Sequence, residues 1–251
     1  MTTFQIASDL HIEYKNNSVP NPLNFINPVA DVLILAGDIG SLYKKEQLTS
    51  FLKQLCIHFK IVLYVPGNHE YYTFPEIRVE KMNVLVDRLY EIEAEIENLY
   101  VLNKTSVRIG DVCISGCTLW SNPEINIPKY IVRINGMTTN IYKEKFESEL
   151  RYINKMIKYC QKNKIKLLVV THHCPTYDVL VGTKKRQKIL SLYANHLDHL
   201  LYSEKVNTWV CGHIHKNFDY VTENGTHLIS NQKGKPNDKI TDFVRDLTIS
   251  V

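Results

Sequence analysis

Short apolar runs alternate with longer segments of helical periodicity in the first third of the chain. Three runs, residues 4–7, 32–36 and 61–65, have the length of buried strands. Between the second and third runs, apolar residues recur at three- and four-residue steps: Leu48, Leu52, Leu55 and Phe59. This pattern predicts β-α-β units with buried parallel strands.

A second helical pattern follows Pro75 and places its apolar residues on one face: Met82, Leu85, Leu89, Ile92, Ile96 and Leu99. Residues 101–120 are strand-rich, and the Gly110-Asp111 turn divides them as it would a hairpin. Residues 121–140 are polar, contain two prolines and have no clear period, so we expect a long surface loop.

The remaining chain repeats the alternation of helix and strand. A third helical stripe carries Phe146, Leu150, Ile153, Ile157 and Cys160 and runs into a strand at residues 167–170. We expect a loop after Pro175, a helix over residues 189–201, a strand at 208–211 and short strands up to residue 251. The sequence therefore predicts an α/β fold, and we interpret residues 1–251 as a single domain.

Composition adds few constraints. Hydrophobic residues at 44% and charged residues at 22% are typical of globular proteins. No apolar run approaches the ~18 residues of a membrane span, and the six cysteines are scattered, so we expect a cytoplasmic protein with reduced thiols and no membrane partner. A net charge of +4 does not identify a nucleic-acid binder, but it suits an anionic substrate.

Residues of the types that bind metals gather directly after five of the predicted strands. In chain order they are Asp9 and His11, Asp38, Asn68 and His69, His172 and His173, and His213 and His215. Each motif has a plain alternative, such as a turn, a helix cap or a hydrogen-bonded core histidine. All of these alternatives would have to hold together in five loops, whereas the carboxyl ends of strands in an α/β sheet converge on one crevice.

The segments SDLHIE, LAGDIG, VPGNHEYY, VVTHHCP and CGHIHK resemble the ordered motifs of the calcineurin-like metallophosphoesterases. The resemblance implies two β-sheets packed face to face with helices outside. It also implies the ligands of two metal ions: Asp9, His11 and His215 for one, Asn68, His173 and His213 for the other, and Asp38 as a bridge.

Carboxylates, imidazoles and one amide oxygen suit Mn²⁺, Zn²⁺ or Fe better than Ca²⁺ or a thiolate-bound cluster. Two such ions ~3.5 to 4 Å apart clamp a phosphate and lower the pKa of a shared water. Cys174 and Cys211 lie close to the proposed ligands, but we expect them to be small buried apolar residues.

Three further residues receive roles. The resemblance implies that His69 protonates the leaving group or stabilises the phosphoryl oxygen, and we expect Glu70 to orient a histidine. Between the adjacent His172 and His173 we prefer His173 as the ligand, since the family's ligand usually lies two residues before a proline, here Pro175. His172 would then contact a ligand or the substrate.

The predicted activity is that of a metal-dependent phosphatase or phosphodiesterase in which a metal-bridging hydroxide attacks phosphorus. Its substrate would be a phosphorylated small molecule, a nucleotide or a phosphoprotein. A nuclease or cyclic-nucleotide phosphodiesterase is the alternative, favoured if the basic run Lys184-Lys185-Arg186 and Lys188 lines the pocket. A non-catalytic module of this fold is the other alternative, and loss of ligands, its mark, is not seen in the motifs. Tyr71 and Tyr72 would either stack on a base or aryl group or only pack against their loop.

Overall fold

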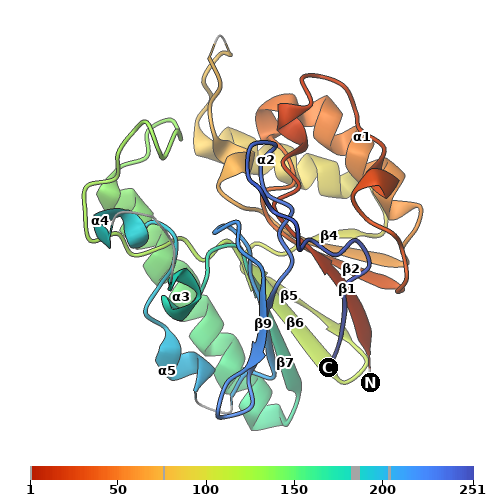
Figure 1. Cartoon of the computed structure of the whole chain (residues 1–251), viewed down its shortest axis with the longest axis vertical. Coiled ribbons are helices and arrows are strands. Elements are labelled where there is room, and N and C mark those ends of the chain that lie inside the picture. The colour runs from red at the N-terminus through yellow and green to blue at the C-terminus, as the bar shows by residue number, and fades with distance from the viewer. Residues whose placement is uncertain (1, 76, 182–186, 203–204) are drawn as a thin grey trace.

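The computed structural model describes residues 2–75, 77–181, 187–202 and 205–251. Within these residues the strands form two sheets with helices outside them (Figure 1). The strand order is β11-β1-β2-β3-β4 in the first sheet and β5-β6-β7-β8-β10-β9 in the second. The expected sandwich of two sheets flanked by helices is therefore confirmed.

The first sheet contains the amino-terminal strands. β1 (Thr3–Ala7), β2 (Val32–Ala36), β3 (Ile61–Val65) and β4 (Leu99–Val101) pair in parallel in that order. β11 (Thr248–Ser250) pairs antiparallel with β1, and this pairing brings the two chain ends together (Figure 1).

The second sheet has a parallel centre and antiparallel edges. Its central strands are β6 (Val112–Cys117), β7 (Lys166–Thr171), β8 (Thr208–Val210) and β10 (His227–Ser230). β5 (Thr105–Ile109) and β9 (Phe218–Val221) pair antiparallel at the two edges, and β5 forms the predicted hairpin with β6.

Side chains from alternate positions of both sheets form the layer between them. Ile6, Ile34 and Leu63 of the first sheet belong to one buried cluster with Ile114 and Val170 of the second. The residues in between, such as Leu33 and Val169, belong to the larger cluster that includes the helices. Both faces of the central strands are therefore buried, as their near-continuous apolar sequences predict.

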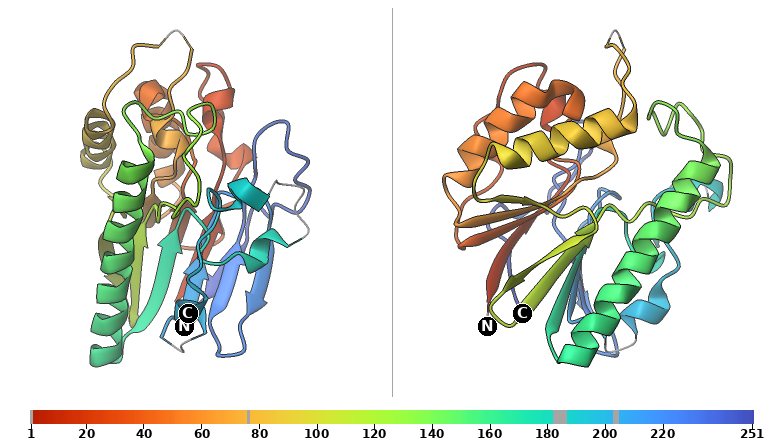
Figure 2. Two further views of the ribbon diagram at one scale, coloured as in Figure 1. Left: turned by 90° about the vertical axis from the view of Figure 1, so that its left-hand side faces the viewer. Right: turned by 180° about the vertical axis from the view of Figure 1, so that it is seen from behind.

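Helices cover the outer face of each sheet (Figure 2). α1 (Lys45–Cys56) and α2 (Met82–Ala94) lie over the first sheet, and α3 (Thr139–Asn163) lies along the second. α4 (Gln187–Leu190) and α5 (Asp198–Leu201) are short. The 3₁₀ turns are η1 (Ile12–Tyr14), η2 (Pro22–Asn24), η3 (Leu42–Lys44), η4 (His69–Tyr71) and η5 (Asp178–Leu180).

Two helix predictions were wrong in extent. The stripe expected to continue to Leu99 ends with α2 at Ala94, and Leu99 instead begins β4, because its pairing with Val62 in the sheet decides its conformation. The single helix expected over residues 189–201 is two helices, α4 and α5. The chain between them bridges back to the segment after β7, where the Asn195 N–H donates to the Cys174 carbonyl at 3.0 Å.

None of the helices in the described ranges is both long enough and apolar enough to cross a bilayer.

Candidate dinuclear metal centre

The loops that follow the strands of both sheets meet at one end of the sandwich. Asp9, His11, Asp38, Asn68 and His69 follow β1, β2 and β3 of the first sheet. The two histidine pairs, 172–173 and 213–215, follow β7 and β8 of the second. Each sheet therefore supplies part of the site, and the contacts below show which side chains meet.

The backbone of this site is unusual. Asp9, His11, Asp38, His213 and His215 all have left-handed φ angles, between 49° and 74°. Such conformations are uncommon for residues with a β-carbon and cost free energy unless the surroundings fix them. The loops fix one another here, since the Asp9 N–H donates to the carbonyl of Gly37 at 2.9 Å and the His11 N–H to that of Asp38 at 3.0 Å.

Four side chains form a first group in which one ligand atom of each lies within 4.8 Å of the others: Asp9, His11, Asp38 and His215. The Nε2 atoms of His11 and His215 are 3.0 Å apart. The His215 Nε2 atom also lies 3.2 Å from Asp9 Oδ1. Electron-donating atoms thus converge from three loops.

Carboxylates behind this group fix the orientation of both imidazoles. The Nδ1 atom of His11 is 2.9 Å from Glu13 Oε1, and that of His215 is 2.5 Å from Asp238 Oδ2. When each Nδ1–H donates to its carboxylate and the Nε2 protons have been lost, both Nε2 atoms carry lone pairs that face each other and Asp9. A cation between the two Nε2 atoms would remove the repulsion between these lone pairs. In metal sites the other nitrogen of a bound histidine commonly donates a hydrogen bond to a carboxylate.

A second group contains Asp38, His172 and His213. The Nδ1 atom of His172 is 2.9 Å from the Ala36 carbonyl, so that Nδ1–H donates there and Nε2 is the nitrogen that can bind a metal once it has lost its proton. That Nε2 atom lies 3.0 Å from Asn68 Oδ1 and 3.2 Å from Asp38 Oδ1. The Nε2 atom of His213 is 3.1 Å from a backbone carbonyl oxygen, which leaves Nδ1 as its lone-pair nitrogen.

Asp38 belongs to both groups, which is the position of a ligand shared by two ions. Its Oδ2 atom is buried and has no hydrogen-bond partner among the described residues. An unpaired buried carboxylate oxygen is costly, and a cation at this place would satisfy it. The donor set of carboxylate, imidazole and amide oxygen fits transition-metal ions.

The charges of the site point the same way. Burial lowers the pKa of His172, but the nearby carboxylates of Asp38 and Asp9 more than offset this and raise it to about 10. Burial likewise lowers the pKa of His215, whereas Asp238 and Asp9 raise it to about 9. The same negative field that retains protons on these imidazoles attracts metal cations in their place.

His173 lies in none of the candidate groups of the described residues, the third of which contains His11, Glu13 and His69. Its Nε2 atom is 3.2 Å from the Tyr142 hydroxyl, and its Nδ1 atom is 3.4 Å from the Thr118 carbonyl. Its ring packs against that of His213, with centroids 4.0 Å apart and the ring planes tilted by 34°. Burial lowers the pKa of His173 to about 3, so the ring is neutral. The geometry therefore favours His172 over His173 as a ligand.

His69 faces the centre from the side of the first group. Its Nδ1 atom is 3.2 Å from Glu13 Oε1, and its Nε2 atom is 4.0 Å from Asp38 Oδ2. Its backbone N–H donates to Asp38 Oδ1 at 2.8 Å. Glu13 therefore contacts both His11 and His69, a role that the sequence interpretation missed although Glu13 lies within SDLHIE.

Glu70 was expected to orient a histidine, but its carboxylate contacts the backbone of two loops. Its carboxylate accepts the backbone N–H groups of Gly67 at 2.7 Å, Ile39 at 2.8 Å and Asp38 at 3.1 Å, and the Tyr64 hydroxyl at 2.6 Å. It thus fixes the loops after β2 and β3 instead of a histidine. The two loops approach so closely that a β-carbon at Gly67 would collide with the Asp38 carboxylate.

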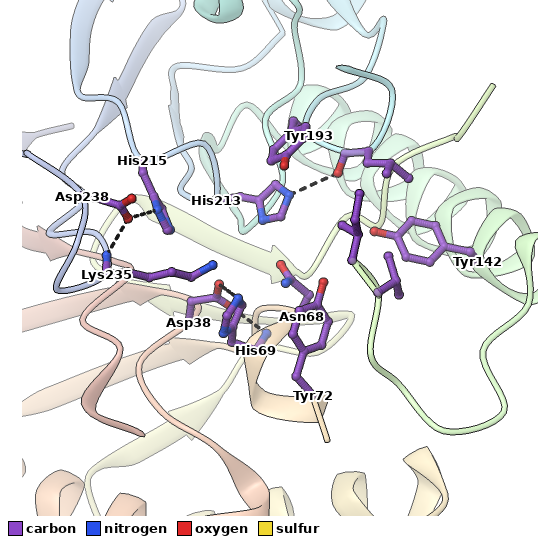
Figure 3. Close-up of a pocket in the computed structure, with 13 residues that line it drawn as sticks. Asp38, Asn68, His69, Tyr72, Tyr142, Tyr193, His213, His215, Lys235 and Asp238 are labelled. Carbon is purple, nitrogen blue, oxygen red and sulfur yellow. Dashed lines mark hydrogen bonds and ion pairs between the residues drawn. The ribbon is translucent and has the colours of Figure 1, made fainter. Parts of the chain in front are cut away.

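A pocket of about 240 Å³ opens over the site (Figure 3). Besides the candidate ligand side chains and His69, polar and aromatic residues line it: Tyr72, Tyr142, Tyr193, Lys235 and Asp238. Tyr71 instead lies buried near Trp120, with ring centroids 6.1 Å apart. The basic residues Lys184, Lys185 and Arg186 lie outside the described residues, as does the side chain of Lys188.

Cys174 and Cys211 are buried next to each other. Their sulfur atoms are 3.3 Å apart, and the Cys174 thiol donates to the Gly212 carbonyl. Within the described chain neither belongs to a candidate metal group.

A sequence model of the calcineurin-like phosphoesterase family matches residues 2–217. The chain belongs to this family and is a phosphoric ester hydrolase. It is also similar to an uncharacterised protein of Acanthamoeba polyphaga mimivirus, with 29% identity over 93% of this chain and 91% of that one.

Solved structures share the fold at low sequence identity. Phosphopantetheinyl hydrolase from Mycobacterium tuberculosis has a TM-score of 0.72 at 16% identity, covering 98% of this chain and 95% of its own. A dimetal phosphatase from Danio rerio has a TM-score of 0.52 at 14% identity, covering 91% of this chain and 86% of its own.

Proposed function

We propose that this protein hydrolyses phosphoesters with two metal ions bound between the loops of its two sheets, at one end of the sandwich. One ion would be held by Asp9, His11 and His215, and the other by Asn68, His172 and His213. Asp38 would bind both. The observation that carries the proposal is that two groups of ligand atoms share Asp38, whose Oδ2 atom is buried and has no hydrogen-bond partner among the described residues.

The assignment of His172 reverses the preference drawn from its distance to Pro175. His172 Nε2 lies near the oxygen atoms of Asn68 and Asp38, whereas His173 Nε2 lies near the Tyr142 hydroxyl. His173 would support the site by packing against the ring of His213.

Bound Mn²⁺, Zn²⁺ or Fe ions would supply a water of lowered pKa and positive charge for the phosphate oxygens. The protein orients the ligands through Glu13, Asp238 and the carbonyl of Ala36, each of which holds a histidine by its other nitrogen. These contacts fix ring direction and tautomer before substrate arrives.

His69 is the proposed proton donor. Its Nδ1 atom is held by Glu13, and its Nε2 atom lies on the pocket side, 4.0 Å from Asp38 Oδ2. Burial lowers the pKa of His69, so this imidazole would hold a proton at Nε2 for the oxygen of the departing group once the negative charge of a bound phosphate raises that pKa again. Positioned acid–base help of this kind accelerates a reaction by about 10² to 10⁴.

The test compares wild-type protein with His69→Ala after Mn²⁺ or Zn²⁺ loading. Elemental analysis should give close to two ions per chain in both. The variant should hydrolyse alkyl phosphates slower by about 10² to 10⁴, and nitrophenyl phosphates less severely because nitrophenolate leaves without a proton. Stoichiometry of one in the wild type would contradict the shared ligand, and full activity of the variant on both esters would contradict the role of His69.

A further inference from the structure

The chain beyond residue 217, where the family match ends, returns to the metal centre. The loop after β10 is anchored there by Gln232, whose Oε1 atom accepts the His215 N–H at 2.6 Å, and by the Lys233 N–H, which donates to Ser8 at 3.1 Å. Lys235 and Asp238 of this loop line the pocket.

The two charges of this loop have different surroundings. The Asp238 carboxylate is engaged by His215 Nδ1 at 2.5 Å and by the Lys235 N–H at 2.8 Å. The ammonium group of Lys235, in contrast, forms no ion pair within the described part of the chain. Its side chain extends toward Asp38 and His69 (Figure 3).

The other side of the pocket is apolar and aromatic. It is formed by Ile131, Val132, Tyr142, Leu192 and Tyr193. With a volume of about 240 Å³, the pocket is small for a ligand site, and a phosphate bound at the proposed metal centre would occupy part of it. The remaining space fits one compact organic group on the apolar side.

We infer that the substrate is a phosphate monoester with a compact aromatic or apolar group, and that Lys235 selects it by binding the phosphate's non-bridging oxygens. This inference rests on the proposed function. A monoester phosphate is a dianion near neutral pH, so an added cation attracts it about twice as strongly as the monoanion of a diester. A diester also carries a second organic group, which would have to occupy the polar side that Lys235 fills.

The experiment compares Lys235→Gln with Lys239→Gln, an exposed lysine on the same loop that does not line the pocket. Manganese-loaded proteins are assayed with 4-nitrophenyl phosphate and bis(4-nitrophenyl) phosphate. Inorganic phosphate binding is measured by calorimetry, and metal content by elemental analysis.

We expect the wild type to prefer the monoester. Lys235→Gln should raise KM for the monoester and Kd for phosphate by about tenfold, the order of one charge-assisted contact, while kcat/KM for the diester changes less than about threefold. Both metal ions should stay bound, and Lys239→Gln should match the wild type.

Equal losses on both esters, unchanged phosphate affinity, or the same effect from Lys239→Gln would overturn the role of Lys235. Wild-type protein that prefers the diester would overturn the substrate class and leave the proposed hydrolysis intact. Metal-loaded wild type that hydrolyses neither ester would instead count against the proposed function itself.

Discussion

Replacing His172 or His173 singly by alanine separates the two assignments of the metal ligands. In the proposed centre the second ion has four protein donors: Asp38, Asn68, His172 and His213. His172→Ala removes one of the four and leaves Asn68 Oδ1 without the nitrogen 3.0 Å away. His173→Ala removes a ring that packs against His213 and a contact to Tyr142.

The expected magnitudes follow from these contacts. Loss of an outer contact typically weakens metal affinity by about 10- to 100-fold, and loss of a direct ligand by more. After dialysis against a graded series of chelator concentrations, His172→Ala should retain close to one ion per chain over a range where the wild type and His173→Ala retain two. Hydrolysis should fall in step with the lost ion.

Elemental analysis of the dialysed proteins, with circular dichroism to establish that each variant is folded, gives the answer. If His173→Ala lost one ion while His172→Ala kept two, the argument from the direction of the ring nitrogens would be wrong. The order of residues before Pro175 would then be the better guide.

Two further predictions concern protons. Because the pKa of His172 is raised to about 10 and that of His215 to about 9, both imidazoles carry a proton at pH 7 that a bound metal must displace. Calorimetry in buffers of different ionisation enthalpy should therefore show the release of about two protons on metal loading. Metal binding without proton release would contradict this prediction. Burial raises the pKa of Glu149 from 4.5 to about 7. Between these pH values the folded state therefore binds more protons than the unfolded state, and the free energy of unfolding should fall by about 3 kcal/mol as the pH rises from 4.5 to above 7. Glu149→Gln should abolish that fall in urea unfolding measured at pH 4.5 and 7.5, and an unchanged fall would assign it to other groups.

Much of the site could be predicted because it lies at strand ends. The runs that form β2 and β3 are apolar on both faces, so their boundaries are marked by the first polar residues after them, Asp38 and Asn68, and Asp9 follows two residues after the end of β1. Parallel strands direct those residues to one edge of the sheet, and this physical rule is sufficient to predict that they lie together.

The same burial on both faces explains the uncertainty over the histidine pair. Successive side chains of a strand point to opposite sides, so a shift of one residue after β7 exchanges the positions of His172 and His173. In a strand with one polar face the alternation would settle the choice. β7 is buried along nearly its whole length and gives no such signal.

The contributions of Lys235 and Asp238 had no local signal at all. They lie in an irregular loop, and their place beside the metal centre depends on contacts that Gln232 and Lys233 make with His215 and Ser8, both remote in the sequence. Likewise α4 and α5 are separate because the chain between them bridges to Cys174, a tertiary contact that periodicity does not reveal.

The proposed ligands come from both sheets, with Asp9, Asp38 and Asn68 on one and His172 and His213 on the other. Bound ions would therefore cross-link the two halves of the sandwich at the end where their loops already meet through the bridge between Ser8 and Gln232. Ligand binding to the folded state alone adds about 2.7 kcal/mol at a hundredfold excess over Kd. A cell depleted of the metal would thus hold a protein that is not only inactive but also more readily unfolded and degraded, so metal supply would set its abundance as well as its turnover.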